Sequence, residues 1–395
     1  MNSWRVPLMI SALLAGSGCT VPVRELHERL LVLDTHLDTP SLFGLAGWDF
    51  AERHRVEDDG SQLDIPRMIE GGLDGGFFAT YIPQGELTDD GRAAARAAAH
   101  TRLDEIHAVV KQHGDLAEIA LTPADARRIT AAGKRVVFLS MENGYPVGNH
   151  PEQLAEFFAR GVRMAGPVHF RNNDLGTSST DVPRTDFPGL TPAGRQWLRE
   201  ANRLGILVDA SHASDAVLDD LLEYSTRPIV LSHSGARAVF AHPRNVDDEH
   251  LRRIAARGGV IQVSAYPDYM VARPASPERS DRIAKLRQSL SGERTAAARR
   301  EQTRRLAEVE RQWPVPQATY DQFVAHLLHV IRVAGVKHAG VGIDFDGGGG
   351  VAGFNDATAY PQITASLREA GLADSEIADV WSGNVLRILA AAQEP

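Results

Sequence analysis

Eight short apolar runs that alternate with helical patterns constrain the fold of this chain more than any other feature. Segments between the runs, such as 191–205 and 214–226, repeat apolar residues at helical spacing and begin with a Thr or Ser cap. Continuous apolar strands between helices are typical of a parallel sheet covered by helices. The pattern predicts an α/β fold of the (β/α)8 TIM barrel type. The eight runs are 30–36, 75–83, 135–143, 162–170, 205–212, 228–234, 258–266 and 338–347.

An open doubly wound sheet is the alternative fold, but it usually has a glycine fingerprint after its first strand. No such fingerprint follows residues 30–36. The longest departure from the repeat is the charged segment 273–316, which favours helix and is broken at Ser291 and Gly292. We expect a helical excursion in the loop after strand seven, which either shapes a lid over the site or is an inert decoration.

The first 19 residues have the build of a bacterial export signal. Arg5 precedes an apolar stretch, 6–15, that is too short to span a bilayer. Small residues then lead to Cys19, the only cysteine, in a pattern that resembles a lipoprotein processing site, although Gly16 stands where Leu is usual. We expect an exported protein, periplasmic or attached to the membrane by a lipid on Cys19. Ordinary cleaved secretion and an uncleaved anchor are the alternatives, and 20–395 is expected to form a single barrel domain.

Composition limits the partners. The 42 Lys and Arg against 51 Asp and Glu leave a formal charge of −9, which argues against nucleic acid or an anionic membrane surface as the main partner. An apolar content of 43% over 395 residues is enough for a large core. The expected partner is a small-molecule substrate, and a homodimer is an assembly that the sequence leaves open.

Polar side chains stand at the C-terminal ends of six of the eight runs. In a barrel these ends meet on the face that carries the active site. One such histidine alone would more often be a core or loop residue, but recurrence at the same topological point indicates a shared function. These residues are His36 and Asp38, Glu142, His169, His212, His233 and Asp344.

Imidazole and carboxylate groups together suit Zn²⁺ or a similar first-row divalent ion. His36 and Asp38 lie two apart in a strand, so both side chains can reach one ion. Five ligands are too many for one tetrahedral zinc, which suggests that Glu142 bridges two ions with a hydroxide between them as the nucleophile. Asp344 remains as a carboxylate suited to moving protons.

Six motifs in this order resemble the membrane (renal) dipeptidase family of zinc peptidases, within the amidohydrolase superfamily. The similarity begins near Leu30 and runs to the closing "GNVLRIL" at 383–389. The resemblance implies two Zn²⁺ per chain, one held by His36, Asp38 and Glu142, the other by Glu142, His212 and His233. The motifs are "DTHLD", "SMENGYP", "VRMAGPVHFRNND", "VDASH", "LSHSGARAVFAHPRNVDDE" and "VGIDFDG".

The resemblance also implies roles around the substrate. His169 would contact the substrate and the developing oxyanion, Arg244 would hold the substrate carboxylate, and Asp344 would transfer the proton. Tyr266 aligns with a family tyrosine near the substrate. The chain lacks the disulfide-forming cysteines and C-terminal apolar tail of mammalian members, and 47–60 differs from them in the pocket wall.

The function expected from these residues is a zinc-dependent dipeptidase, with dipeptides that carry a C-terminal D-residue among its candidate substrates. Another amide or ester hydrolase on the same site, such as an N-acyl amino acid deacylase or a lactonase, is the alternative enzyme. A lipoprotein that binds peptides or metal without turnover is the alternative of another class, and Asp344 argues against it. For Arg244 the alternative is a surface ion pair with Asp247 or Asp248.

Overall fold

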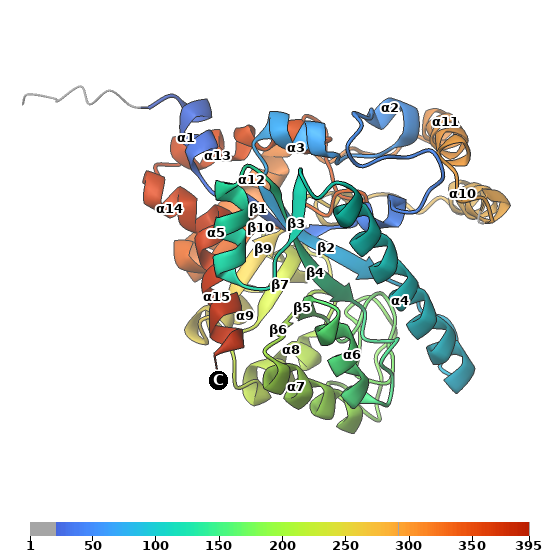
Figure 1. The fold of residues 1–395 in the computed structure, drawn as a ribbon. Helices are drawn as coiled ribbons and strands as arrows, with labels where there is room; N and C mark the ends of the chain where they lie inside the picture. The colour runs from blue at the N-terminus through green and yellow to red at the C-terminus, as the bar shows by residue number, and fades with distance from the viewer. Residues whose placement is uncertain (1–20, 291, 395) are drawn as a thin grey trace, which may run out of the picture.

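The computed structural model describes residues 21–290 and 292–394. Parallel strands lie at the centre of the molecule and helices surround them (Figure 1). All eight predicted strands form, and they make up the barrel wall. They are β1 (Leu33–Leu37), β2 (Gly75–Tyr81), β4 (Arg135–Glu142), β5 (Val162–Ala165), β6 (Leu207–Val208), β7 (Val230–Ala236), β9 (Val260–Val263) and β10 (Ala339–Val341).

Two sheets close into the barrel. The first has the order β1-β2-β4-β5-β6 and the second the order β10-β9-β7-β8, with β3 (Ala117–Ile119) beside β4 and β8 (Asn245–Val246) beside β7. A parallel bridge between Asp209 and Val230 joins them on one side, and a parallel bridge between Leu37 and Phe345 joins them on the other. The expected TIM barrel is therefore confirmed.

Several predicted runs extend beyond the strands that form. β5 ends at Ala165, where Pro167 follows and cannot donate to the ladder. β6 ends before His212 and β10 before Asp344, and both of these residues have a positive φ that takes the backbone out of the extended region. His169, His212 and Asp344 thus lie in the loops that follow the strands, as does Asp38, the first residue after β1.

Helices cover the outside of the barrel, and local signals set their limits. The Thr191 hydroxyl accepts a hydrogen bond from Gly194 N at the start of α7, and Gly205, with φ 76°, ends that helix. The helices are α1 (Val23–Arg29), α2 (Val56–Asp59), α3 (Ile65–Gly71), α4 (Asp89–Gln112), α5 (Pro123–Ala131), α6 (Leu154–Ala159), α7 (Pro192–Leu204), α8 (Asp215–Tyr224), α9 (Asp248–Ala256), α10 (Pro277–Leu290), α11 (Ala296–Gln312), α12 (Tyr320–Ala334), α13 (Pro361–Glu369), α14 (Asp374–Ala378) and α15 (Asn384–Gln393).

The charged segment after β9 forms the helices α10 and α11, as the sequence predicts. The two helices pack on each other and stand beside α2 at the edge of the molecule (Figure 1). Arg299 Nε donates to Asp59 O at 2.8 Å, and Ala46 pairs with the backbone at the start of α11. The excursion is therefore docked on the loop that follows β1.

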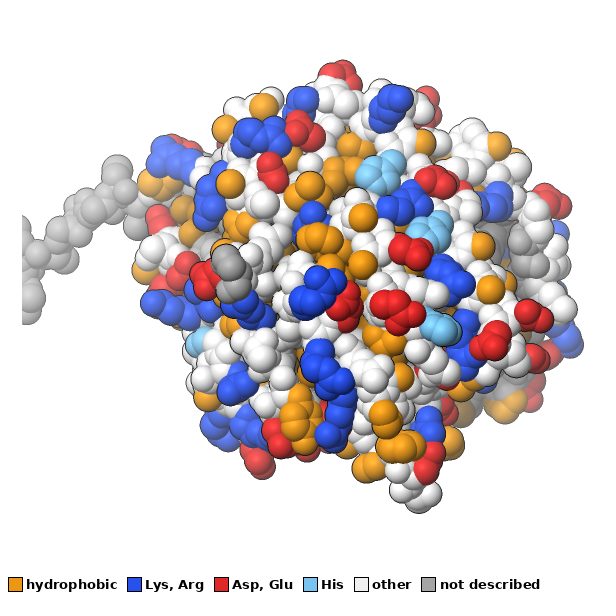
Figure 2. Space-filling model, turned by 60° about the horizontal axis from the view of Figure 1, so that its bottom comes forward, with side chains coloured by type: hydrophobic (Ala, Val, Ile, Leu, Met, Phe, Trp, Pro, Cys, Tyr) orange, Lys and Arg blue, Asp and Glu red, His pale blue; other side chains and the backbone are white. Residues whose placement is uncertain are grey.

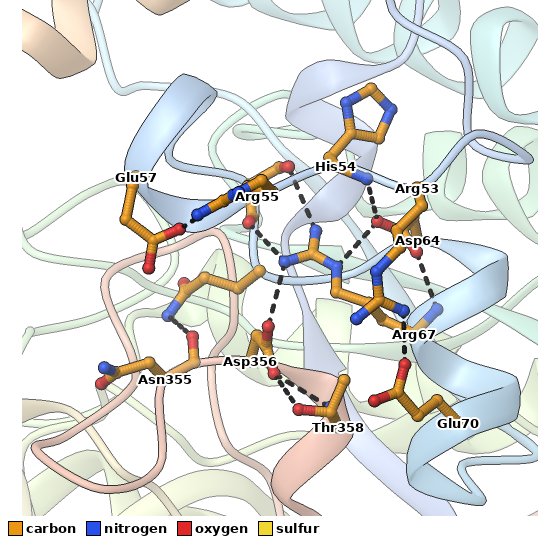
Figure 3. Close-up of polar contacts among 12 residues, drawn as sticks. Arg53, His54, Arg55, Glu57, Asp64, Arg67, Glu70, Asn355, Asp356 and Thr358 are labelled. Atoms are coloured by element: carbon orange, nitrogen blue, oxygen red, sulfur yellow. Dashed lines mark hydrogen bonds and ion pairs between the residues drawn. The ribbon is translucent and has the colours of Figure 1, made fainter.

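A buried ion pair holds the end of that same loop. Arg67 Nε donates to Asp64 Oδ2 at 2.7 Å, and Arg67 Nη1 donates to Ser61 O at 2.8 Å and lies 3.4 Å from Asp356 Oδ2 (Figure 3). Both Arg67 and Asp64 are at most 1% exposed. The nearby pair of Arg53 and Glu70, drawn in the same view, is solvent-exposed.

The surface has mixed charge on the face that Figure 2 shows, where Lys and Arg alternate with Asp and Glu and with apolar side chains. Within residues 21–290 and 292–394, no helix has the length and apolar character that crossing a bilayer requires. Cys19 and the export signal lie outside the described residues. Export, lipid attachment and the single-domain boundary at residue 20 stay predictions.

Replacing Arg67 with Met should lower the free energy of unfolding by about 3–5 kcal/mol, because it leaves the Asp64 carboxylate buried without its cation. The matched change Arg53→Met removes an exposed ion pair and should cost about 0–1 kcal/mol. Urea denaturation of both variants at one zinc concentration measures the difference. Equal losses would show that the buried pair does not hold this loop.

Candidate metal centre

Glu142 lies at the centre of the converging strand ends. It is the last residue of β4, and it is only 6% exposed. Its Oε1 atom lies within 3.5 Å of the Nε2 atoms of four histidines, which belong to four other strands or to the loops that follow them. The distances are 3.5 Å to His36, 3.5 Å to His169, 3.0 Å to His212 and 3.3 Å to His233.

This spacing fits metal ligands. Nitrogen and oxygen ligands about 2.0–2.1 Å from a tetrahedral zinc ion lie about 3.3 Å from one another. His212 Nε2 and His233 Nε2 are 2.9 Å apart, and each lies close to Glu142 Oε1. Both ring nitrogens of His36 are buried without a hydrogen-bond partner. A buried imidazole nitrogen without a partner is costly, and a metal ion bound to Nε2 would satisfy one of the two.

Two carboxylates extend the cluster on the side of His36. Asp38 Oδ2 lies 3.5 Å from His36 Nε2, and ligand atoms of His36, Asp38 and Asp344 lie within 4.8 Å of one another. A Cβ at Gly347 would lie 2.0 Å from Asp38 Oδ2 and 2.2 Å from Asp344 Oδ1. Only glycine therefore lets the backbone approach these carboxylates so closely.

The backbone around the cluster adopts a rare conformation. Non-glycine residues with positive φ among the described residues number four, and all of them lie in the loops that follow β4, β6 and β10. Such conformations cost free energy and persist where the surrounding structure imposes them. They turn the chain sharply after the strands, and they are Asn143 (78°), His212 (66°), Asp344 (72°) and Asp346 (65°).

The cluster favours a bound cation. Burial opposes a charge on His36, but the carboxylates of Glu142 and Asp38 raise its pKa. Burial raises the pKa of Asp344 well above its usual value, and Asp38 and Glu142 add to this effect. Burial and the positive charge of Arg244 lower the pKa of His169 to about 3 and the pKa of His212 well below its usual value. Neutral imidazoles of this kind can ligate a metal.

Ser232 orients one of the imidazoles, and it is not among the site residues predicted from the sequence. Ser232 Oγ donates to Asp209 Oδ2 at 2.6 Å, so its oxygen is left to accept from His233 Nδ1 at 2.8 Å. A proton on Nδ1 leaves the Nε2 lone pair free, as ligation requires. His233 Nε2 is the nitrogen that lies close to Glu142.

Arg244 lies inside the protein and makes no ion pair with any described residue. Its Nη2 donates to His233 O at 2.9 Å, and its guanidinium lies 5.1 Å from the centroid of the Tyr269 ring. Its Nε is buried without a hydrogen-bond partner. The alternative of a surface ion pair with Asp247 or Asp248 is wrong, since Arg244 is 3% exposed.

A cavity of about 310 Å³ opens over the cluster. Tyr266 lies in its wall, stacked on Tyr269 with ring centroids 4.4 Å apart. Six of the lining residues are predicted from the sequence and seven are not, although the position of Tyr81 at the end of β2 is a signal of the same kind. The missed residues are Ser41, Tyr81, Phe170, Tyr269, Arg287, Asp346 and Gly347.

Replacing Ser232 with Ala should weaken metal binding by about 10- to 100-fold, the usual cost of losing such a partner of a ligating histidine. Ser140→Ala is the matched control, because the Ser140 hydroxyl is buried in β4 without a hydrogen-bond partner. Competition with a chromophoric chelator measures both affinities. Equal affinities in the two variants would remove Ser232 from the site.

Comparisons with known proteins agree with this geometry. Residues 21–395 match the family described as Membrane dipeptidase (Peptidase family M19). Dipeptidase tcpJ of Claviceps purpurea is 28% identical over 360 residues, which cover 88% of this chain and 74% of that protein.

Solved structures are similar as well. The probable dipeptidase PvdM from Pseudomonas aeruginosa is 30% identical with a TM-score of 0.79, over 94% of this chain and 97% of that one. A metallo peptidase from Rhodobacter sphaeroides, liganded with a phosphinate mimic of the dipeptide L-Ala-D-Ala, is 25% identical with a TM-score of 0.70, over 92% of this chain and 99% of that one. The resemblance predicted from the motifs is confirmed: the protein belongs to the membrane dipeptidase family, peptidase family M19, a family of metal-dependent dipeptidases.

Proposed function

We propose that this protein hydrolyses dipeptides with two zinc ions that share Glu142. The observation that carries the proposal is the single oxygen of Glu142 within 3.5 Å of four imidazoles. Its carboxylate is close enough to both sides of the cluster to be shared. One ion would be held by His36, Asp38 and Glu142, and the other by Glu142, His212 and His233.

Zinc in these positions would supply Lewis acidity and an activated water nucleophile. Two side chains of the protein would assist the reaction: His169 would stabilise the oxyanion and Asp344 would transfer the proton. The low pKa of His169 keeps the imidazole neutral, so it can donate a hydrogen bond to the carbonyl oxygen as negative charge grows there. Asp344 is buried beside Asp38, and its raised pKa lets it hold the proton that the leaving amine needs.

Selection of a dipeptide requires a group that recognises the end of the substrate. Arg244 is the candidate, because its guanidinium has an unsatisfied Nε and no carboxylate partner among the described residues. A substrate carboxylate can accept two hydrogen bonds from such a fork. In a dipeptide this carboxylate lies a short, fixed distance beyond the scissile amide.

The size of the cavity supports a small substrate. At about 310 Å³ it lies at the lower end of the roughly 300–1,000 Å³ found for ligand pockets. The phosphinate mimic in the Rhodobacter sphaeroides structure imitates a dipeptide whose second residue has the D configuration. We include dipeptides with a C-terminal D-residue among the substrates proposed here.

The purified protein should contain close to two zinc equivalents and lose its activity to a chelator. Glu142→Gln should lower occupancy at both sites, since both share this carboxylate. Asp344→Asn should keep the zinc and slow turnover by about 10²–10⁴-fold, the usual contribution of a general acid or base. Elemental analysis that finds one tightly bound ion in the fully active enzyme would contradict the shared carboxylate.

The wild-type protein should strongly prefer a dipeptide to the same dipeptide with a C-terminal amide. Arg244→Ala should remove this preference at a cost of about 1.5–3 kcal/mol, or roughly tenfold to a hundredfold in kcat/KM. Arg244→Lys keeps the charge without the fork and serves as the matched variant, with zinc content measured in each protein. Equal cleavage of the acid and the amide by the wild type would favour a deacylase or lactonase.

A further inference from the structure

The helical excursion after β9 contributes a residue to the cavity over the metal centre. Arg287 of α10 lines this cavity, whereas the other lining residues end barrel strands or lie in the loops that follow them. It is the only Lys or Arg among the described lining residues. Four carboxylates line the same space, namely Asp38, Glu142, Asp344 and Asp346. Among the described residues that line the cavity, Arg287 is thus the one with a guanidinium, while Arg244 lies deeper, beneath the lining.

Arg287 has no hydrogen bond or ion pair with a described residue, and Arg282 of the same helix has none either, but only Arg287 of the two lines the cavity over the metal centre. Several other basic residues of the excursion are paired. Lys285 pairs with Asp281 at 2.7 Å, and Arg273 pairs with Asp268 at 2.9 Å. Arg279 pairs with Glu310 of α11. The guanidinium of Arg287 is exposed and is left available to a carboxylate from outside the chain.

Packing and hydrogen bonds hold the excursion against the barrel and so fix the position of Arg287. Leu286, next to Arg287, is 7% exposed where α10 packs on α11. At the start of α11, Arg294 Nη2 donates to Phe43 O at 2.9 Å and lies 2.9 Å from Glu105 Oε1. Ala46 and Thr295 form a parallel bridge. These contacts tie the excursion to the loop after β1, which also carries Asp38 and Ser41 into the cavity.

Arg244 and Arg287 lie near different members of the stacked pair Tyr266 and Tyr269. The Arg244 guanidinium lies over Tyr269, and Tyr269 stacks on Tyr266. Burial raises the pKa of Tyr266 to about 12, and the positive charge of Arg287 acts against this rise. The two arginines therefore offer two separate positions for negative charge, and a dipeptide whose C-terminal carboxylate occupies the first leaves the second for another group.

We propose that Arg287 binds a carboxylate carried by a side chain of the dipeptide, so that the enzyme prefers substrates with an acidic residue. This inference rests on the proposed function, because it assigns a substrate class to the same site. An unpaired guanidinium forms charge-assisted hydrogen bonds with such a carboxylate, and it offsets the repulsion from the four carboxylates of the cavity. The acidic residue can be the first or the second of the dipeptide, which the substrates below distinguish.

The test compares isosteric pairs that differ in charge alone: Glu-Gly against Gln-Gly, and Gly-Glu against Gly-Gln. In the zinc-loaded wild type, kcat/KM should be about tenfold or more higher for the acidic member of at least one pair. Arg287→Ala should bring that ratio close to one, and Arg287→Glu should invert it. Arg282→Ala is the matched control. Arg282 also lies on α10, but its side chain lines the crevice between α10 and α11 and not the cavity over the metal centre. This variant loses the same charge from α10 and should keep the wild-type ratio.

Binding separates this inference from the proposed function. In the zinc-loaded Asp344→Asn protein, calorimetric Kd values for the same pairs should show the same preference, and adding Arg287→Ala should abolish it. A wild-type ratio near one, or a ratio that survives Arg287→Ala, overturns the inference. If no dipeptide is cleaved but the binding preference disappears with Arg287, the dipeptidase proposal fails while the carboxylate site stands.

Discussion

The carboxylate of Glu142 is the interaction on which the rest of the site depends. It is buried at the end of β4, and four imidazoles lie within 3.5 Å of one of its oxygens. β4 pairs with β2 through every residue from Gly75 and Val136 to Tyr81 and Glu142, so the ladder itself fixes where this carboxylate stands. A buried carboxylate is unfavourable without positive charge nearby, so the C-terminal end of the barrel requires a cation at this position.

The need to hold a cation beside Glu142 also accounts for unfavourable backbone conformations and close contacts around the site. His212 and Asp344 have left-handed backbones, which are unfavourable for residues other than glycine. Gly347 brings its backbone against two carboxylates, and Ser232 uses its hydroxyl to join Asp209 to His233. Each of these features costs stability or restricts the sequence, and each places a metal-type ligand or a proton carrier. Stability of the barrel and assembly of the metal centre are therefore coupled.

Chemistry and selectivity come from different parts of the fold. Groups around Glu142 stand at strand ends, where the barrel wall holds them rigidly. Arg287 comes from a helical excursion that packs outside the wall and reaches back over the cavity. Loops of this kind can change without disturbing the barrel, which is how one metal centre can serve different substrates.

The sequence by itself determined the barrel and the set of metal-type ligands. Apolar runs and helical periodicity report local burial, and residues such as His36 and Glu142 belong to the C-terminal parts of their strands, so topology alone brings them to one face. Only the tertiary structure placed the Arg244 guanidinium over the Tyr269 ring and away from the surface, joined Ser232 to His233, and brought Arg287 to the cavity. These contacts join segments that are far apart in the sequence. The periodic pattern within one segment predicts its own secondary structure but not which other segment it contacts.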